Sequence, residues 1–295
     1  MPVVLEHQRS CSEYESSLSY ALCLKARSVF LFLRKSLVFL GGYQDFLYLR
    51  TRFMRYFIWF SYDGTNYHGW QMQPNGNTVQ AELQRGLSLL LREDITVTGA
   101  GRTDTGVHAR QMAAHFDTER SFDPAELAKK MNGVMPQDIS VSRVEEVAPD
   151  MHARFSATAR TYHYYIHTRK NPFRRYFSLE LHYQLDFALM NEAARILMEY
   201  EDFGAFCKAG SDVKTTICHI KEARWVQTAD DAWYFEITAN RFLRNMVRAV
   251  VGTLIEVGRH RMTLDEFRQV ILGGRRTQAG ESMPALALCL EKIVY

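Results

Sequence analysis

The order of the predicted strands and helices constrains the fold more than any other feature of this sequence, because the same series occurs twice. Residues 54–156 predict strand, helix, strand, strand, helix, strand, and residues 157–295 repeat that order with variations. Each series is the split βαβ arrangement of ferredoxin-like proteins. The sequence therefore predicts an α/β protein of the α+β type, whose two ferredoxin-like halves join in a broad, mainly antiparallel sheet.

Local patterns define the elements of the first half. Apolar residues at helical spacing indicate a helix after Asn77, and Asn77 with Gln80 predicts its capping pair. The run Asp123-Pro124-Ala125-Glu126 combines a cap, a proline at the first helical position and a glutamate three residues after the cap, which predicts a second helix. Strands are expected at residues 56–61, on both sides of Asp104, and from residue 139 to residue 147.

The second half has the same kinds of signal. A helix that follows Thr263 is indicated by a cap with Glu266 three residues on. The other elements are a strand at 160–168, a helix at 186–200, a hairpin of 217–228 with 233–239, a helix at 242–257 and a last strand at 285–294.

Residues 1–53 differ from the rest of the chain. Their apolar run at 29–40 is broken by Arg34 and Lys35, so it is shorter than the roughly 18–20 apolar residues that a membrane span needs. No cleavage site of small residues follows a clean apolar core. We expect residues 1–53 to be a poorly ordered extension, or an upstream stretch read from too early a start codon, and we expect no membrane association.

Composition limits the partners and the compartment. The 47% apolar content is that of an ordinary globular protein. The 36 Lys and Arg residues exceed the 33 Asp and Glu residues only slightly, so an anionic partner must meet a local cluster of positive charge. The five cysteines are scattered and form no Cys-x-x-Cys pair, which predicts a reducing cytoplasm with no disulfide frame and no zinc site.

The stretch from Gly99 to Ala109 concentrates unusual residues in one turn. Asp104 lies between two threonines, close to Arg102, in a glycine-punctuated segment that joins two predicted strands. Strand ends commonly present chemical groups to a ligand, and a carboxylate there is a candidate nucleophile or base. Ordinary turn chemistry also accounts for Asp-Thr-Gly, because Asp and Gly are frequent turn formers.

The segment Gly101-Arg102-Thr103-Asp104-Thr105-Gly106-Val107-His108-Ala109 resembles the catalytic signature of the TruA-type tRNA pseudouridine synthases. The resemblance extends from Met54 to the C-terminus. It implies two halves with a central cleft, and an isomerase that converts uridine to pseudouridine at positions 38, 39 and 40 of the tRNA anticodon arm. It also implies a homodimer, with Asp104 as the nucleophile and no cofactor or metal.

A carboxylate in a pocket that excludes water needs a nearby cation to stay ionised, because desolvation disfavours the charged form. Arg248, in Asn245-Met246-Val247-Arg248, matches another motif of the family and is the expected partner of Asp104. A helix from Phe242 would place Arg241, Arg244 and Arg248 on one stripe. Phosphate binding and a solvated charged face explain Arg241 and Arg244 equally well.

Three further motif residues have expected roles. Tyr162, in Arg160-Thr161-Tyr162, matches the family tyrosine that stacks on the target uracil, although tyrosines also suit a half-buried strand without any function. Arg102 is expected to occupy the space of the extruded uridine and to bind phosphate. His108 is expected to brace its loop, since a carboxylate that acts as a nucleophile or as a base does not need an additional imidazole base.

Other segments that resemble the family are expected to hold RNA. They are Gly69-Trp70-Gln71, Arg110, Arg154 and the loop from Lys208 to Lys214. Each basic residue among them could equally be an ordinary surface charge.

Two other classes of protein were weighed. A non-catalytic RNA-binding module would use a ferredoxin-like sheet with exposed aromatic residues, but it would carry a glycine-aromatic signature that this sequence lacks. A zinc-dependent base deaminase requires His-x-Glu and Pro-Cys-x-x-Cys, and both are missing. The route of catalysis stays open between attack on the base, attack on the ribose and initial proton abstraction from the ribose.

Overall fold

The structure is a computed structural model that describes residues 53–211 and 213–295. The chain from Phe53 to Tyr295 forms one compact unit. The extension expected at residues 1–53 lies, apart from Phe53, outside the described residues. No helix within the described ranges is long and apolar enough to cross a membrane.

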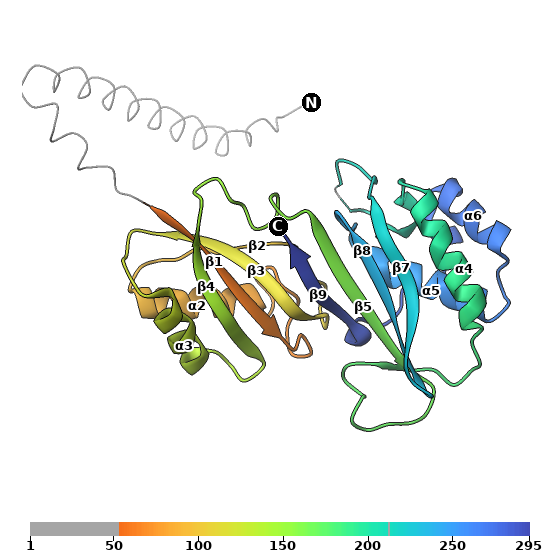
Figure 1. The fold of residues 1–295 in the computed structure, drawn as a ribbon, viewed down its shortest axis with the longest axis horizontal. Coiled ribbons are helices and arrows are strands. Elements are labelled where there is room, and N and C mark those ends of the chain that lie inside the picture. Colours follow the sequence, from red (N-terminus) through yellow and green to blue (C-terminus); the bar gives the residue numbers. More distant parts are fainter. Residues whose placement is uncertain (1–52, 212) are drawn as a thin grey trace, which may run out of the picture. The chain divides into compact units, whose positions relative to one another are not determined.

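The described chain forms a nine-stranded sheet in the order β4-β1-β3-β9-β5-β8-β7, with β2 paired to β3 and β6 paired to β5 (Figure 1). The strands are β1 (Met54–Tyr62), β2 (Thr98–Gly99), β3 (His108–Thr118), β4 (Ile139–Val147), β5 (Ala159–His167), β6 (Leu179–Glu180), β7 (Ile220–Ala229), β8 (Ala232–Ala239) and β9 (Leu288–Val294). The helices are α2 (Val79–Leu91), α3 (Pro124–Val134), α4 (Phe187–Ile196), α5 (Met246–Gly258) and α6 (Leu264–Gly273).

The two halves of the sheet have the same strand order, which confirms the predicted fold class. The first half reads β4-β1-β3-β2 and the second, without the two-residue strand β6, reads β9-β5-β8-β7, so in both cases the order is fourth, first, third and second. Pairing is antiparallel except between β3 and β9 and between β5 and β6. Because β9 pairs with β3 on one side and β5 on the other, the last strand of the chain joins the halves.

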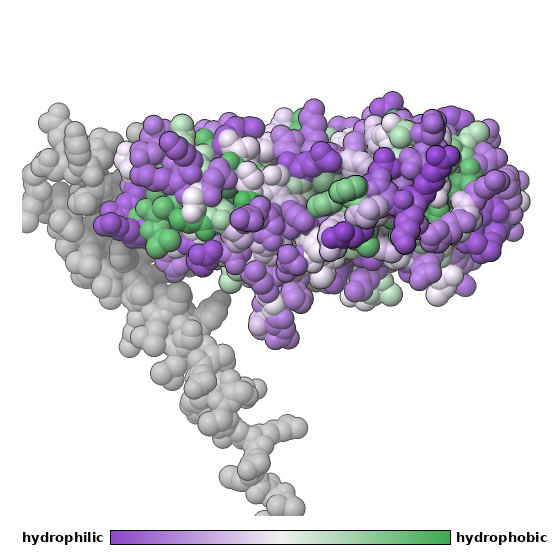
Figure 2. Space-filling view, turned by 90° about the horizontal axis from the view of Figure 1, so that it is seen from below, coloured by the Kyte–Doolittle hydropathy of each residue, from purple (hydrophilic) through white to green (hydrophobic). Residues whose placement is uncertain are grey.

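Each half packs its own helices against the sheet. One cluster of buried side chains combines α2 and α3 with β1, β3 and β4, and the other combines α4, α5 and α6 with β5, β7 and β8. Strand β9 serves both, since Leu288 belongs to the second cluster and Leu290 and Ile293 to the first. The face of the molecule in Figure 2 shows hydrophobic residues scattered among hydrophilic ones, as is normal for a protein surface.

Of the three predicted helix caps, two are confirmed and one is wrong. Asp123 caps α3 by accepting from the N–H of Ala125, and Thr263 with Glu266 forms a complete capping box at α6. At α2 the cap is Thr78 instead of Asn77. Gln80 has a tertiary role there, because its side chain donates to the carbonyl oxygen of Val97 at 2.9 Å.

Helix α5 begins four residues later than predicted, at Met246 instead of Phe242. Asn245 has a φ of 66°, a left-handed conformation that Asn tolerates better than most residues and that interrupts a helix. The predicted stripe of Arg241, Arg244 and Arg248 on one helix is therefore wrong. Only Arg248 lies on α5, and the other two arginines lie in the segment that leads into it.

Three other element boundaries differ by a few residues from the predicted ones. The helix expected at 186–200 ends at Ile196 and continues as the 3-10 turn Leu197–Glu199. The first hairpin strand begins at Ile220, and a 3-10 turn over Ala285–Ala287 precedes β9.

Candidate active site

Asp104 lies in a tight turn between β2 and β3, which we call the Asp104 turn (residues 101–106). The N–H of Val107 donates to the carbonyl oxygen of Asp104 at 3.1 Å. Gly106 has a φ of 78°, the conformation that the third position of a type II turn requires. Val107 belongs to the second hydrophobic cluster and Ala109 to the first, so both halves anchor the chain directly after the turn.

The loop after β1 fixes the Asp104 turn from the first half. The hydroxyl oxygens of Tyr62 and Thr103 are 2.8 Å apart, and the N–H of Trp70 donates to the carbonyl oxygen of Thr103 at 3.3 Å. Gly69 has a φ of 87°, and a Cβ there would lie 2.4 Å from that same oxygen, so a side chain would not fit. The segment Gly69-Trp70-Gln71 was expected to hold RNA. Trp70 is only 3% exposed, however, so its ring is not accessible to RNA.

Arg248 faces the Asp104 carboxylate from the first turn of α5. Its Nη1 lies 3.4 Å from Oδ2 of Asp104, and the two side chains are 21% and 30% exposed. The Nε of Arg248 donates to the carbonyl oxygen of Met283 at 2.6 Å, and the N–H of Met283 donates back to the carbonyl oxygen of Arg248 at 3.1 Å. These two bonds hold the guanidinium in place beside the carboxylate.

Arg244 approaches the other oxygen of the same carboxylate. Its Nε lies 4.0 Å from Oδ1 of Asp104, and its side chain is 60% exposed. Its carbonyl oxygen accepts from the N–H of Lys208 at 3.0 Å. The sequence left Arg244 open between phosphate binding and a solvated charged face, and the structure places its guanidinium beside the Asp104 carboxylate.

Tyr162 lies on β5 at the junction of the two halves. Leu290 of β9 is the register partner of both Tyr162 and Ala109, which puts the tyrosine beside the strand that follows the Asp104 turn. Its ring packs edge-on against Phe242, with centroids 5.2 Å apart. Burial raises the pKa of Tyr162 to about 12, and the charge of Asp104 adds to the increase, so the hydroxyl stays neutral.

The comparison with known proteins agrees with this geometry. The sequence model of a tRNA pseudouridine synthase family matches residues 58–156 and 193–295, which include Asp104, Arg244 and Arg248. The chain belongs to the tRNA pseudouridine synthase family. The synthase is thus an isomerase that converts uridine to pseudouridine.

Curated relatives cover nearly the same part of the chain. A tRNA pseudouridine synthase A from Bacteroides thetaiotaomicron is 56% identical over 243 residues, which is 82% of the synthase and 90% of the relative. The protein of the same name from Bacteroides fragilis is 54% identical over 242 residues, 82% and 96% of the two chains. That from Porphyromonas gingivalis is 48% identical over 244 residues, 82% and 97% of the two chains.

Sequence reasoning missed Arg160, which ties several parts of the synthase together. Its guanidinium donates to four carbonyl oxygens, those of Ala157 (3.0 Å), Asn240 (2.6 Å), Ala100 (3.1 Å) and Arg154 (2.5 Å). Ala100 directly precedes the Asp104 turn, Arg154 and Ala157 lie in the link between the halves, and Asn240 lies in the segment before α5. The alternation of side chains along β5 could have indicated a role for Arg160. It places Arg160 on the same face of the strand as Tyr162, and a charged group that is partly buried on that face needs hydrogen-bond partners.

The structure places the other predicted RNA contacts around the site. Arg102 is exposed on the Asp104 turn, and Arg154 is exposed with its guanidinium 5.6 Å from the centre of the Phe155 ring. Lys208 is exposed, and its backbone is joined to Arg244. Arg241 is half-buried.

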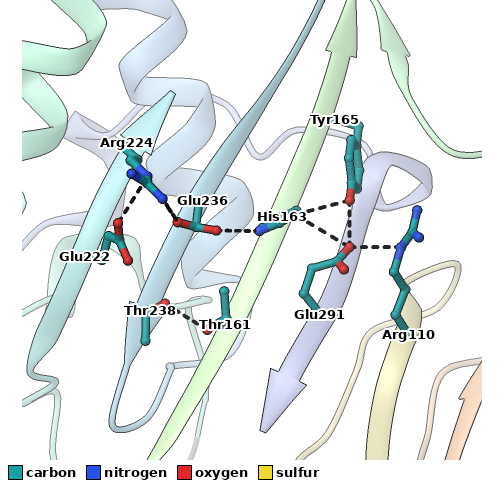
Figure 3. A network of polar contacts seen from close by, with 9 residues as sticks. All are labelled: Arg110, Thr161, His163, Tyr165, Glu222, Arg224, Glu236, Thr238 and Glu291. Atoms are coloured by element: carbon teal, nitrogen blue, oxygen red, sulfur yellow. Dashed lines mark hydrogen bonds and ion pairs between the residues drawn. The ribbon is translucent and has the colours of Figure 1, made fainter. Parts of the chain in front are cut away.

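Arg110 lies in a polar network on the sheet (Figure 3). Its Nε is 3.2 Å from Oε1 of Glu291, which also accepts from the hydroxyl of Tyr165 at 2.7 Å. The network continues through His163 to Glu236. Burial opposes ionisation of Glu236, but hydrogen bonds from His163 and a neighbouring arginine lower its pKa. Arg110 therefore has a carboxylate partner already, although its side chain is 69% exposed.

His108 joins the Asp104 turn to distant parts of the synthase. Its Nδ1 accepts from the N–H of Gly64 at 3.0 Å, and its Nε2 lies 2.9 Å from the carbonyl oxygen of Leu286. It is 4% exposed, and these bonds fit the bracing role expected for it. Within residues 53–211 and 213–295, no group of three or more His, Cys, Asp or Glu side chains is placed to hold a metal ion.

Proposed function

We propose that the synthase isomerises uridines 38, 39 and 40 in the anticodon stem-loop of tRNA, with Asp104 as the nucleophile. The observation that carries this proposal is the Asp104 carboxylate, which is held in a fixed turn and faces Arg248 at 3.4 Å. The names of the relatives and the resemblance of the Asp104 segment to the TruA-type signature support the choice of substrate.

Each residue has a defined task in this proposal. The bond between N1 of uracil and the ribose breaks, a bond between C5 and the same ribose carbon forms, the C5 proton is released and N1 takes up a proton. Asp104 attacks the base or the ribose, or first removes a ribose proton, and Arg248 holds a positive charge beside its carboxylate. Tyr162 stacks on the uracil, and Arg102 takes the place of the extruded nucleotide.

Other basic residues hold the backbone of the RNA. We assign phosphate contacts to Arg110, Arg154, Arg241, Arg244 and Lys208. Since uracil only changes its point of attachment, the reaction requires no redox centre, nucleotide or metal, and we expect no cofactor.

We also propose that the synthase works as a homodimer in the cytoplasm. The family resemblance supports the dimer, and sedimentation of the purified protein at several concentrations tests it. The cysteines Cys207, Cys218 and Cys289 are free and buried, which is compatible with a reducing compartment.

The first prediction tests the nucleophile. Asp104→Asn keeps the shape of the side chain but removes its charge, so turnover should be abolished while tRNA still binds. The measurement is tritium release from C5-labelled uracil, because C5 must lose its hydrogen when it becomes the glycosidic carbon. Asp94→Asn, at an exposed carboxylate, is the matched control and should behave as the parent protein. Release by Asp104→Asn at the parental rate would disprove the assignment.

A further inference from the structure

The connection between β5 and β6, residues 168–178, is a basic and aromatic exposed loop outside the site described above; we call it the basic loop. It contains no Asp or Glu. It lies between the two segments that the family model matches. Its basic residues are Arg169, Lys170, Arg174 and Arg175, and its aromatic residues are Phe173, Tyr176 and Phe177.

The aromatic side chains of the basic loop face solvent. Phe173 is 92% exposed, Tyr176 is 48% exposed and Phe177 is 47% exposed. Exposed aromatic residues this close together in one loop form an apolar patch, which is the kind of surface that binds a partner.

Hydrogen bonds within the basic loop give it a defined shape. The side chain of Asn171 accepts from the N–H of Phe173 at 3.0 Å, and its carbonyl oxygen accepts from the N–H of Arg174 at 3.1 Å. The N–H of Phe177 then donates to the carbonyl oxygen of Arg174 at 3.0 Å. These bonds fix the backbone on both sides of Phe173. The side chain of Phe173 belongs to neither of the two hydrophobic clusters.

The basic loop is attached next to the Asp104 turn. The ring of Phe177 packs on His108, with centroids 4.8 Å apart, and His108 begins β3 directly after the turn. Arg174 is fixed by Asp231 at 3.4 Å. A cavity of about 480 Å³ opens between the loop and the ends of β1 and β3. Its lining includes Phe173, Arg174, Phe177 and Arg110, with the carboxylates of Asp63 and Asp138 also present.

This chemistry matches single-stranded RNA. Exposed cations bind phosphates, aromatic rings stack on unpaired bases, and carboxylates accept hydrogen bonds from base amino groups. The remaining cations, Arg169, Lys170 and Arg175, have no acidic neighbour within the loop that would neutralise them.

We propose that the basic loop is a second RNA-binding surface of the synthase, which takes phosphates and an unpaired base of the tRNA outside the nucleotide that is isomerised. The inference rests on the proposed function, because it takes tRNA as the substrate. The loop supplies affinity and positions the RNA, and the chemical step stays with Asp104.

The test removes the charges that are free to bind RNA. In the triple variant R169A/K170A/R175A, the Kd for tRNA should rise about tenfold, while kcat at saturating tRNA should stay at the parental value. The slope of log Kd against log salt should become shallower by about two to three, since each lost phosphate contact contributes about 0.7–0.9. All three side chains are exposed, so the fold should be retained.

The matched control removes the same charge elsewhere. R85A/K129A/K130A changes exposed residues of α2 and α3, and it should alter neither Kd nor the salt slope. Phe173→Leu keeps an apolar side chain but removes the aromatic face, and it should weaken tRNA binding several-fold without changing the salt slope.

Two outcomes would overturn the proposal. One is a triple variant and a Phe173→Leu variant that bind tRNA with the parental Kd and salt slope. The other is a triple variant with parental RNA affinity and an altered mass in sedimentation, which would make the loop a surface for a second copy of the chain. Binding is measured without turnover, so a failed Asp104 assignment would leave this result unchanged.

Discussion

Two arginines face the oxygens of the Asp104 carboxylate, and they are held in different ways. Arg248 is fixed by Met283 and is 21% exposed, whereas Arg244 is 60% exposed and 4.0 Å from its oxygen. An exposed ion pair at that distance is worth little, because solvent and salt screen it. The fixed and less exposed Arg248 should therefore interact more strongly with the carboxylate than Arg244 does.

The corresponding prediction is that mutation of Arg248 impairs the catalytic step, whereas mutation of Arg244 impairs tRNA binding. Arg248→Ala should lower kcat at saturating tRNA by more than tenfold, equivalent to about 1.4 kcal/mol. Arg244→Ala and Arg241→Ala should mainly raise the Kd for tRNA and flatten its salt dependence. Single-turnover rates and binding curves measure both quantities. An Arg248→Ala variant that changes only the tRNA concentration for half-maximal rate would contradict the pairing.

The sequence could name Asp104, Arg248 and Tyr162, since each lies in a local motif, but it could not supply their surroundings. The bond from Arg248 to Met283 and those from Arg160 to four carbonyls join residues that are far apart in the chain. The contact of Arg244 with Asp104 was missed because the sequence favoured a continuous helix through Asn245. Such contacts depend on the folded topology, and no local pattern encodes them.

At the scale of elements, helix starts were predictable where the signal was local. Asp123 at α3 and Thr263 with Glu266 at α6 bond only to residues within three positions, so the sequence contains the whole capping motif. The start of α5 depends instead on Asn245, whose side chain donates to the hydroxyl of Ser282 at 2.6 Å. A distant segment thus stabilises the left-handed residue that delays the helix.

Strand β3 carries a buried histidine that makes stability depend on pH. His115 is 7% exposed, and its Nδ1 accepts from the N–H of Ala153 at 3.1 Å. Burial and the positive charges of Arg55 and His152 lower its pKa to about 4, while Asp117 opposes this effect. Between an ordinary histidine pKa of about 6.5 and this value, the unfolded chain binds a proton that the folded protein does not.

We therefore expect the free energy of unfolding to fall as the pH drops from about 6.5 toward about 4, by at most about 1.4 kcal/mol per pH unit from this residue. Denaturant titrations at several pH values measure the decline. His115→Asn can still accept from Ala153 but does not titrate, so its decline should be shallower. Equal slopes in the two proteins, or an NMR titration of His115 near pH 6.5, would refute the assignment.

At the scale of the whole molecule, the last strand of the chain completes the site. Strand β9 lies between β3 and β5, and its Leu290 is in register with both Ala109 and Tyr162. Arg160 adds a second tie across the same junction. The Asp104 turn and Tyr162, which belong to different halves, are thereby joined through one strand, and both halves must fold before the site exists.

The parts that build this site all lie after residue 53, which leads to a prediction about the chain as a whole. Strand β1 begins at Met54, the compact unit begins at Phe53 and the family model first matches at residue 58. A protein that lacks residues 1–53 should therefore fold and isomerise tRNA as the full chain does. Its thermal midpoint should lie within about 2–4 °C of the full chain, the shift that about 1 kcal/mol produces in a domain of this size.

The full chain, purified in parallel, is the control for both measurements. Arg55 gives a sensitive check of the new terminus, because it pairs with Asp117 at 2.7 Å and donates to the carbonyl oxygen of Met151 at 3.0 Å. If the truncated protein kept its activity but melted much lower, the first residues of β1 would need the chain before them. If it bound tRNA normally but lost turnover, residues 1–53 would contribute to the site, and residues 54–295 would not be a sufficient catalytic unit.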